Sequence, residues 1–406
     1  MIAGFFLLRG RGYKQALYSF LEDIKTAVSL KLKELEPQSA LEKKLKNAPY
    51  PRIANIFLKT PFSEEEAIQL ARYDVLILAL QAQTVNSYEI ELIKRKNPDI
   101  ILLAYTDPIA FPEGRLKELE PSGSGLWHIL GKEITETNYL KTFRGEKISL
   151  GDPKLQTYLI NLLTKTKNGK LFAYYRAEFY AKEVASFKYW DGIFFDTTWP
   201  TISWIKPGQI DYDNDGKPDP HEVVDDRWNR GLSLFFNHLR SLVPKDFLLI
   251  GNDQGKFFSW LNGRMFEDFP SDFNCFPNNK TCGWQGSTFE YITRQKTAAP
   301  PQLNIINAST RNSGIENHSE MMFGLATTLL GDGYFLYDFG SAHRSTLWYY
   351  PEFDFDLGKP LEGPKYLNNG LWQDPTDWQE GIYKREFEKA TIFVDVLKRE
   401  GKIQFK

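Results

Sequence analysis

Several absences limit what this chain of 406 residues can be. No run of apolar residues approaches the roughly eighteen that a membrane-spanning helix needs. Neither sign of charge predominates, because 50 Lys and Arg residues stand against 52 Asp and Glu residues, whereas nucleic-acid-binding proteins normally carry a basic face. No Ser-His-Asp arrangement, phosphate-binding loop or dinucleotide-binding fingerprint is recognisable. We therefore expect neither a membrane span nor a nucleic-acid partner, and we take the chain to be a monomer.

Cysteine is scarce as well, and the two that occur, Cys275 and Cys282, lie in one short polar stretch. Their spacing favours a local disulfide, and hence an extracellular or cell-surface location, although two free thiols in a cytosolic protein are the alternative. A metal site on these cysteines is not expected, because no second pair of Cys or His accompanies them. The apolar residues 2–8 have no basic residue before them and no small-residue cleavage site after them, so no cleavable signal peptide is predicted.

Aromatic residues, by contrast, are abundant. The chain contains 10 Trp, 20 Tyr and 30 Phe, which together make up 15% of its residues. With 42% hydrophobic residues the sequence can bury a large core, which excludes a disordered chain. The surplus of rings is consistent with a cleft lined by aromatic side chains.

From residue 51 onwards the sequence alternates between strand-like and helix-like segments. Eight short runs are almost continuously apolar, as parallel strands buried on both faces require. These runs are 53–58, 75–80, 100–105, 192–196, 247–251, 264–267, 303–307 and 334–338. Segments predicted to be helices lie between them, at 64–72, 87–96, 173–186, 225–242 and 316–330. The alternation predicts an α/β fold, a (β/α)8 TIM barrel over residues 51–350, with an elaborated loop between residues 105 and 192.

Two smaller parts flank the predicted barrel. Apolar residues recur at three- and four-residue steps between residues 13 and 46, so residues 1–50 are expected to form a helical extension that Pro37 interrupts. Residues 351–406 contain three short strand-like runs, at 382–387, 391–397 and 402–405. These runs predict a small C-terminal antiparallel β appendage.

Polar side chains follow nearly every predicted strand, at the end of a barrel where reactive groups lie. Carboxylates and amides bond to sugar hydroxyls, and ring faces stack on sugars, so the set suits a carbohydrate. Lys and Arg are missing from it, which argues against a structural ion-pair network, whereas helix capping is the alternative for any single Asp or Asn. The polar members are Gln81, Gln83, Tyr105, Asp107, Asp196, Asn252, Asp253, Glu267, Asp268, Asn307 and Asp338. The rings expected beside them are Trp199, Trp204, Trp284 and Trp348.

Two members of this set stand out, because Asp196 and Glu267 each end an apolar strand two strands apart in the predicted barrel. Such strand ends lie roughly across the barrel mouth, which suits two carboxylates that flank one glycosidic bond. We predict that Glu267 is the general acid/base, since its apolar neighbours raise its pKa, and that Asp196 is the ionised partner. The reverse assignment stays open. The residues expected to bind substrate around them are Tyr105, Asp107, Trp199, Asn252, Asn307 and Asp338.

An acidic loop gives a second, independent signal. Residues 211–222 carry oxygen ligands at loop positions 1, 3, 5, 9 and 12 and a glycine at position 6, which is the spacing of a twelve-residue calcium loop. The predicted structural Ca²⁺ ligands are Asp211, Asp213, Asp215, the Lys217 backbone carbonyl, Asp219 and Glu222. Pro218 and the lack of a clear preceding helix depart from an EF-hand, and an acidic solvated turn is the alternative.

Several separate motifs between residues 50 and 385 also resemble a known family. They are residues 50–55, 97–100, 190–196, 210–216, 261–267 and 323–335. On these motifs the chain resembles the glycoside hydrolases of hypothetical glycosyl hydrolase family fifteen. The resemblance implies a (β/α)8 barrel distantly similar to the endo-α-1,4-polygalactosaminidases. In those enzymes an Asp ending the fourth strand and a Glu ending the sixth are the expected catalytic pair, and these positions fall on Asp196 and Glu267.

The sequence therefore predicts a glycosidase that cleaves a polysaccharide, with an α-linked or amino-sugar exopolysaccharide as the expected substrate. A catalytically inactive barrel that binds carbohydrate is the main alternative, since it would need the rings and amides but not both carboxylates. A calcium-dependent adhesion or scaffold protein is a third hypothesis, and it depends on the acidic loop alone.

Overall fold

The computed structural model describes residues 39–252, 256–257, 259–270, 283–293 and 297–406. The chain divides into two compact units, residues 1–46 and 47–406. Helix α2 (Ala40–Asn47) is the described element of the N-terminal part, with Leu41 and Leu45 buried. The rest of the predicted N-terminal helical segment lies outside the described residues.

Residues 47–406 contain the predicted barrel. Its eight parallel strands are arranged in the order β1, β2, β3, β7, β9, β10, β11, β12. A parallel bridge between Ile53 and Phe335 joins the first and last strands. The strands are β1 (Ala54–Phe57), β2 (Val75–Ala79), β3 (Ile101–Thr106), β7 (Gly192–Phe195), β9 (Leu248–Gly251), β10 (Gly263–Phe266), β11 (Ile305–Ser309) and β12 (Tyr334–Asp338). The prediction of a (β/α)8 barrel is confirmed.

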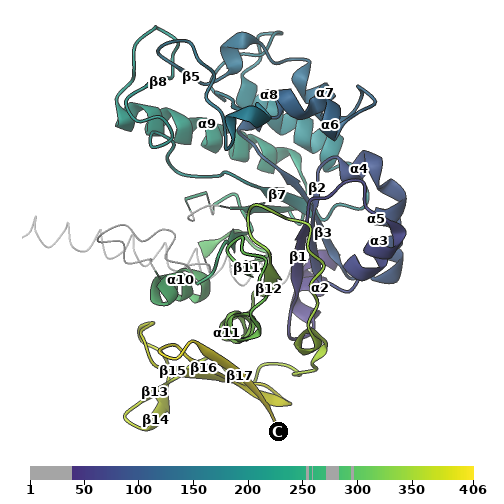
Figure 1. Cartoon of the computed structure of the whole chain (residues 1–406), viewed down its shortest axis with the longest axis vertical. Helices are drawn as coiled ribbons and strands as arrows, with labels where there is room; N and C mark the ends of the chain where they lie inside the picture. The colour runs from purple at the N-terminus through teal and green to yellow at the C-terminus, as the bar shows by residue number, and fades with distance from the viewer. Residues whose placement is uncertain (1–38, 253–255, 258, 271–282, 294–296) are drawn as a thin grey trace, which may run out of the picture. The chain divides into compact units, whose positions relative to one another are not determined.

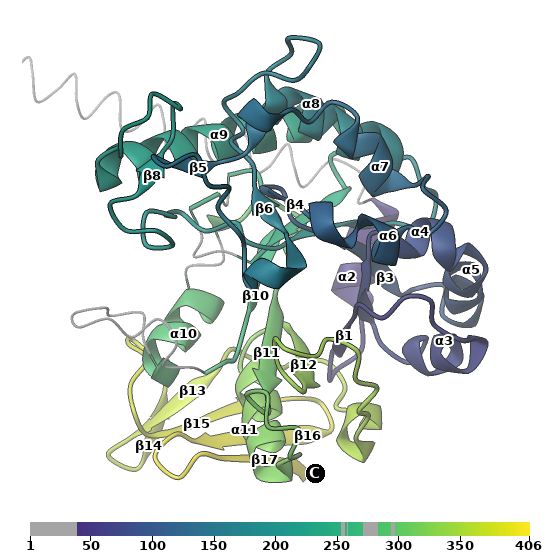
Figure 2. The same cartoon turned by 45° about the horizontal axis from the view of Figure 1, so that its top comes forward.

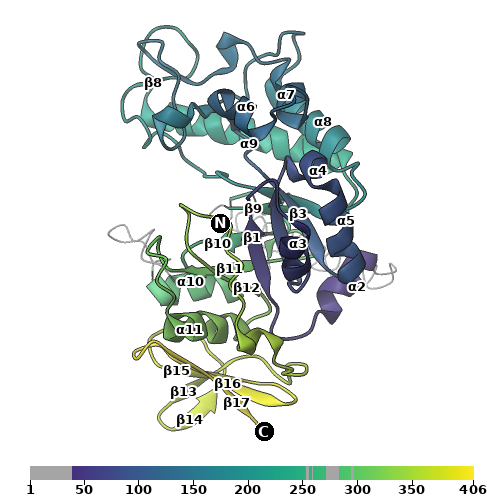
Figure 3. The same cartoon turned by 45° about the vertical axis from the view of Figure 1, so that its right-hand side comes forward.

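Nearly all residues of these strands are buried, because the barrel interior covers one face and helices cover the other. The connecting helices are α3 (Glu64–Leu70), α4 (Ala82–Val85), α5 (Ser87–Lys96), α8 (Phe172–Phe179) with the π-helical turn η4 (Tyr180–Val184), α9 (His221–Leu242), α10 (Gly283–Ile292) and α11 (His318–Leu329). Figure 3 shows α3 and α5 on the outer side of β1 and β3. No described helix combines the length and apolarity that crossing a membrane would demand.

Glycine opens the two strands that end in the candidate carboxylates. A Cβ atom on Gly192, the first residue of β7, would lie 2.4 Å from the Leu248 carbonyl oxygen. A Cβ atom on Gly263, the first residue of β10, would lie 1.8 Å from the Leu303 carbonyl oxygen, and the φ of Gly263 is 155°. Close backbone approach therefore requires glycine where β7 and β10 enter the barrel.

The long segment between β3 and β7 forms the predicted elaboration (Figure 2). It contains the short helices α6 (Leu116–Leu119) and α7 (Leu126–Gly131) and three short strands that take part in two small antiparallel pairs. One pair joins β4 (Ala110–Phe111) to β6 (Tyr158–Leu159), and the other joins β5 (Lys141–Thr142) to β8 (Ile210–Asp211), which follows β7. Their buried apolar side chains belong to the same hydrophobic cluster as those of β3 and β7.

The C-terminal appendage is a five-stranded antiparallel sheet in the order β14, β13, β15, β16, β17. Three strands match the prediction, β15 (Ile382–Glu386), β16 (Ala390–Asp395) and β17 (Glu400–Phe405), while β13 (Lys365–Asn368) and β14 (Leu371–Gln373) were not predicted. Figure 1 shows helix α11 between this sheet and the barrel strands β11 and β12. Arg385 of the sheet donates to Asp332 at 2.9 Å, just before β12, so the appendage is attached to the barrel by polar as well as apolar contacts.

Candidate active site

Three neighbouring strand ends bring the two predicted catalytic carboxylates together. Asp196 follows β7, Asn252 follows β9 and Glu267 follows β10. The Asn252 side-chain amide donates to Asp196 Oδ1 at 3.0 Å and to Glu267 Oε2 at 3.2 Å. Since one amide nitrogen donates both bonds, the two accepting oxygens lie no farther apart than the sum of the two distances, about 6.2 Å. One amide therefore spans both members of the pair.

Asp196 is held entirely by neutral donors. Besides Asn252, the Tyr105 hydroxyl donates to its Oδ2 and the Thr197 backbone amide donates to its Oδ1 at 2.8 Å. Burial raises the pKa of Tyr105 well above its usual value, and the adjacent Asp196 adds to this effect, so Tyr105 stays a donor. Three fixed donors therefore hold the Asp196 carboxylate in place.

Glu267 has a different environment, because a cation reaches it. Arg344 Nη2 donates to Glu267 Oε1, while 33% of the Glu267 side chain remains exposed. Burial raises the pKa of Glu267 above its usual value; Arg344 opposes this shift, and the negative charge of Asp196 adds to it. The net shift is upward, as a group that must deliver a proton near neutral pH requires.

Arg344 corrects the expectation that the polar strand ends form no ion-pair network, because it pairs with Glu267 and Asp338. It follows β12 by six residues, and its backbone carbonyl accepts from the Leu58 amide at 2.6 Å, which brings the loop across the end of β1. Its guanidinium donates to Asp338, to Asn307 Oδ1 at 3.0 Å and to Glu267. The sequence signal was weak, since Arg344 belongs to a loop rather than to a strand end.

Asn307 and Asp338, which were predicted to bind sugar hydroxyls, lie beneath this arginine. Asn307 is 0% exposed and Asp338 is 2% exposed. Asn307 also donates to Asp338 Oδ1 at 3.1 Å. The structure thus places both side chains where they support Arg344.

Asp107 supports Asp196 indirectly, because it accepts from Thr197, the residue after Asp196. Its Oδ1 accepts from the Ile109 amide at 2.8 Å, and its Oδ2 accepts from the Thr197 hydroxyl. Burial, reinforced by the charge of Asp196, raises the pKa of Asp107 to about 7. Of the predicted substrate-binding residues, Tyr105 and Asn252 directly contact the catalytic pair, and Asp107 contacts it through Thr197.

The geometry of these strand ends agrees with the comparison of the chain with known families. The profile of hypothetical glycosyl hydrolase family 15 matches residues 94–391, which include β7, β9 and β10. The chain belongs to this family. No curated protein matches it significantly. The family resemblance carried by the sequence motifs is confirmed.

The four tryptophans expected near the site of this family 15 protein divide into two groups. Trp199, which is partly exposed, lies three residues after Asp196, and its ring centroid is 5.1 Å from that of Trp204, which is 56% exposed. Trp284, expected near the cleft, instead lies on α10 and packs against Tyr383 of β15, with 5.0 Å between ring centroids. Trp348 packs against Tyr337 of β12. Trp199 and Trp204 therefore remain the candidates for stacking on a sugar, and the expectation for Trp284 is wrong.

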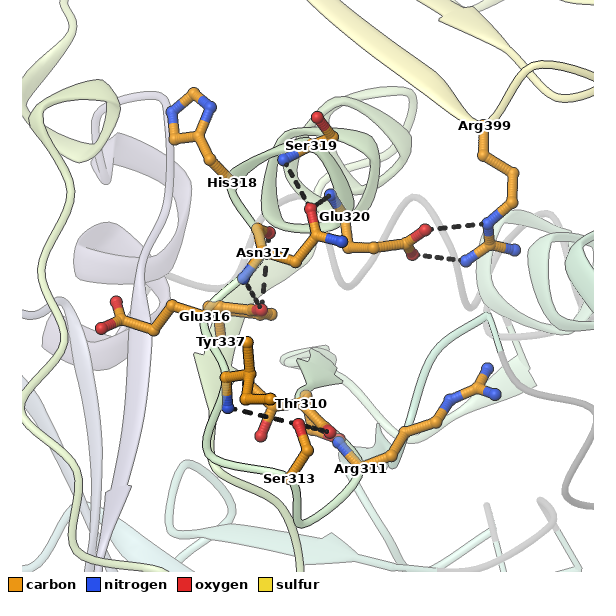
Figure 4. Close-up of a pocket in the computed structure, with 12 residues that line it drawn as sticks. Thr310, Arg311, Ser313, Glu316, Asn317, His318, Ser319, Glu320, Tyr337 and Arg399 are labelled. Atoms are coloured by element: carbon orange, nitrogen blue, oxygen red, sulfur yellow. Dashed lines mark hydrogen bonds and ion pairs between the residues drawn. The ribbon is translucent and has the colours of Figure 1, made fainter.

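A cavity of about 730 Å³ lies beside the end of β11 and the first turn of α11 (Figure 4). Its lining is mostly polar, and the Glu320–Arg399 ion pair forms one side of it. A second, small cavity shares Ser309 and Arg311 with it and also touches Asp268. Asp268, the residue that follows Glu267, thus lines the small cavity, which lies beside the larger one.

The acidic loop brings together part of the predicted calcium ligand set. Carboxylate oxygens of Asp211, Asp213 and Asp215 lie within 4.8 Å of one another, an arrangement that fits Ca²⁺. Asp219 accepts from the Tyr212 amide at 2.7 Å, and Arg227 lies 3.0 Å from Asp213 and 3.6 Å from Asp219. Glu222 is exposed in the first turn of α9, and Lys217 Nζ lies 3.7 Å from Asp215. Three of the six predicted ligands therefore converge.

Cys275, Cys282 and Asp253 lie outside the described residues. The disulfide and the oxidising compartment that it implies stay predictions.

Proposed function

We propose that the protein is a glycosidase in which Asp196 and Glu267 cleave one glycosidic bond. The observation that carries this proposal is the Asn252 amide, which donates to both carboxylates and keeps them within reach of the same bond. Two carboxyl groups in different environments are what glycoside hydrolysis requires, because one must donate a proton while the other stays ionised.

Their separation favours retention of configuration. Retaining enzymes keep their carboxyl groups about 5–5.5 Å apart, whereas inverting enzymes leave about 6.5–9.5 Å for a water molecule. Because each oxygen is bonded to Asn252, the two oxygens cannot lie more than about 6.2 Å apart, the sum of the two donor–acceptor distances. This upper limit lies below the inverting range, and we therefore propose a double displacement.

In the first step Asp196 attacks the anomeric carbon as Glu267 protonates the leaving oxygen, so a glycosyl ester forms and the glycosidic bond breaks. In the second step the ionised Glu267 takes a proton from water, the water oxygen attacks the anomeric carbon, and Asp196 leaves as a carboxylate. Tyr105, Asn252 and the Thr197 amide stabilise Asp196 when it carries the negative charge.

The charge of the mouth supports an amino sugar or a neutral sugar over a uronic acid. Five carboxyl side chains surround the pair or belong to it, and Arg344 donates hydrogen bonds to two of them, those of Glu267 and Asp338. The carboxyl groups are those of Asp107, Asp196, Glu267, Asp268 and Asp338. We propose an α-linked or amino-sugar exopolysaccharide as the substrate, with Trp199 as the stacking surface and the cavity beside α11 as space for a neighbouring sugar unit.

Reducing-end release from a panel of exopolysaccharides tests the proposal. The panel should include a deacetylated amino-sugar polymer, its acetylated form and a uronic acid polymer. We expect release from the deacetylated polymer and loss of release in Asp196→Asn and Glu267→Gln. Binding of a polymer without release by the unaltered protein would instead support the inactive barrel that only binds carbohydrate.

We further propose that the acidic loop binds one structural Ca²⁺ ion and that the protein acts outside the cell or at its surface. The converging carboxylates of Asp211, Asp213 and Asp215 support the first proposal. The predicted disulfide supports the second.

A further inference from the structure

The residues directly after the two candidate catalytic carboxylates share an unusual backbone conformation. Thr197 has a φ of 52° and Asp268 has a φ of 51°, both in the left-handed region. Residues other than glycine rarely adopt this region, and for a β-branched residue such as threonine it is a genuine outlier. Strained backbone of this kind tends to occur where function requires it.

Burial separates these two residues from other left-handed positions. Among the described residues, eight non-glycine residues have a positive φ. Six of them are exposed, namely Gln156, Asn214, Arg311, Asn312, Asn369 and Arg399. Thr197 is 4% exposed and Asp268 is partly buried, and Thr197 is the β-branched member of the group. The two left-handed residues without free exposure thus both follow a candidate catalytic carboxylate.

A neighbouring strand end holds each of these residues. The Thr197 hydroxyl donates to Asp107, which follows β3. The hydroxyl of Ser309, the last residue of β11, donates to Asp268, and the Phe269 amide donates to the Asn307 carbonyl at 2.7 Å. Each turn is therefore attached to the strand beside it in the barrel.

The left-handed turn at Thr197 acts directly on the neighbouring carboxylate. It directs the Thr197 backbone amide onto Asp196 Oδ1 at 2.8 Å, while the hydroxyl of the same residue is bound to Asp107. Without the hydroxyl bond the backbone can relax and move this amide away from Asp196. We infer that Thr197 and Asp268 are positioning residues, whose left-handed backbone, held from the adjacent strand, fixes the two carboxylates for catalysis. The inference rests on the proposed glycosidase function.

Substitutions at Thr197 test the inference, because glycine removes both the strain and the hydroxyl whereas serine keeps the hydroxyl. We expect the folded fraction of Thr197→Gly to lose about tenfold or more in kcat with KM within about twofold. Thr197→Ser should recover most of the lost kcat. Asp268→Gly should lower kcat in the same way and serves as the second variant should Thr197→Gly not fold.

Asn369→Gly is the matched control, since Asn369 has a φ of 48° in the exposed turn between β13 and β14. It should relax a left-handed residue without any change in kcat. A Thr197→Gly variant with native kcat overturns the inference, and so does one that loses stability while its folded fraction keeps native kcat, because the turn is then only structural.

A crystal structure of Thr197→Gly separates this inference from the proposed function. We expect the Asp196 carboxylate to leave its bond with Asn252 in at least part of the molecules. If the unaltered protein hydrolyses no substrate, the glycosidase proposal fails, while the position of this carboxylate still decides the inference. A carboxylate at full occupancy in its native position contradicts it.

Discussion

The ends of strands β7 and β10 carry the two candidate catalytic carboxylates, and the hydrogen-bond partners of the two carboxylates differ. Asp196 after β7 accepts from a phenol, a backbone amide and a side-chain amide, all of them neutral. Glu267 after β10 shares Asn252 with Asp196 but is also bound by the Arg344 guanidinium. The donors to Asp196 thus carry no charge, whereas Glu267 lies between burial, which favours its protonated form, and a cation, which favours its ionised form.

This difference explains how two carboxylates that share one hydrogen-bond donor can have separate roles. A general acid/base must change its protonation state twice in each catalytic cycle, so opposing influences on Glu267 suit that role. A nucleophile must stay ionised until it attacks, and fixed dipoles suit that role. The opposite assignment would place the arginine on the nucleophile, and the first prediction distinguishes the two.

The largest effect is expected when either carboxylate is removed. Asp196→Ala and Glu267→Ala should each fold normally and lose about 10⁴-fold or more in kcat on a natural substrate. With an aryl glycoside whose leaving group needs no protonation, added azide should rescue both variants. Glu267→Ala should then release a glycosyl azide of retained configuration, because azide attacks the glycosyl ester on Asp196, whereas Asp196→Ala should release one of inverted configuration.

Asp99→Asn is the control for this experiment, because Asp99 is an exposed carboxylate just before β3, at the opposite end of the strands. Its activity should equal that of the unaltered protein. Exchanged configurations of the two azide products would reverse the assignment of Asp196 and Glu267.

A smaller loss of kcat is expected at Arg344, which donates to Glu267 after β10. Arg344→Met leaves Asp338 buried without its cation, which costs about 3–5 kcal/mol of the free energy of unfolding. Arg344→Lys should retain more stability, but a single ammonium group does not match the forked contact with Asp338 and Glu267, so kcat should fall in both variants.

The pH dependence of Arg344→Met tests the direction in which Arg344 shifts the pKa of Glu267. Arg344 lowers the pKa of Glu267, so its removal should raise that pKa further. Activity that needs protonated Glu267 is lost as pH rises through its pKa, and the basic limb of kcat/KM should therefore move to higher pH. Movement of the acidic limb instead would mean that Glu267 acts in its ionised form.

The sequence predicted most of the barrel because buried parallel strands leave a continuous apolar signal. All eight strands lie within one or two residues of their predicted positions. Strands β13 and β14 were missed, since their residues are half-buried or exposed and show no alternation. The carboxylates and Asn252 were predictable because a barrel gathers its strand ends on one side.

Other features of the site depend on the tertiary contacts that loops and helices make. Arg344 reaches the mouth because its loop is bound to Leu58 after β1, a contact between residues far apart in the sequence. Trp284 was expected near the cleft, yet helix α10 places it against the C-terminal sheet. The left-handed turns at Thr197 and Asp268 were also not predictable from the sequence, because neither residue is a glycine.

A modest shift in the pH dependence of kcat/KM is expected from Asp268→Asn. This substitution alters the charge beside Glu267 and leaves the residues after β7 unchanged. Asparagine tolerates the left-handed conformation and can still accept from Ser309, so the fold should be unaffected. The negative charge of Asp268 contributes to the raised pKa of Glu267, so its removal should lower that pKa. The basic limb of kcat/KM should move to lower pH, opposite to the shift in Arg344→Met, and an unmoved limb would exclude Asp268 from the control of Glu267.

The smallest effect on catalysis is expected from calcium, which concerns the connection after β7. An ion that binds the folded loop and not the unfolded chain stabilises the protein by about 2.7 kcal/mol at a hundredfold excess over Kd. Melting in calcium should therefore occur a few degrees higher than in a chelator, and Asp213→Asn should abolish the difference. Because the converging carboxylates of Asp211, Asp213 and Asp215 do not contact Asp196 or Glu267, kcat should change by less than about twofold.

Arg227 provides the sharper version of this measurement. Its guanidinium lies 3.0 Å from Asp213 and 3.6 Å from Asp219, so it occupies carboxylate oxygens that an ion would use. Arg227→Gln removes the competing charge and should enlarge the calcium-dependent rise in melting temperature. Identical melting curves in calcium and chelator for both the unaltered protein and Arg227→Gln would show that the loop is an acidic turn stabilised by Arg227, and that the β7 end is organised without a metal ion.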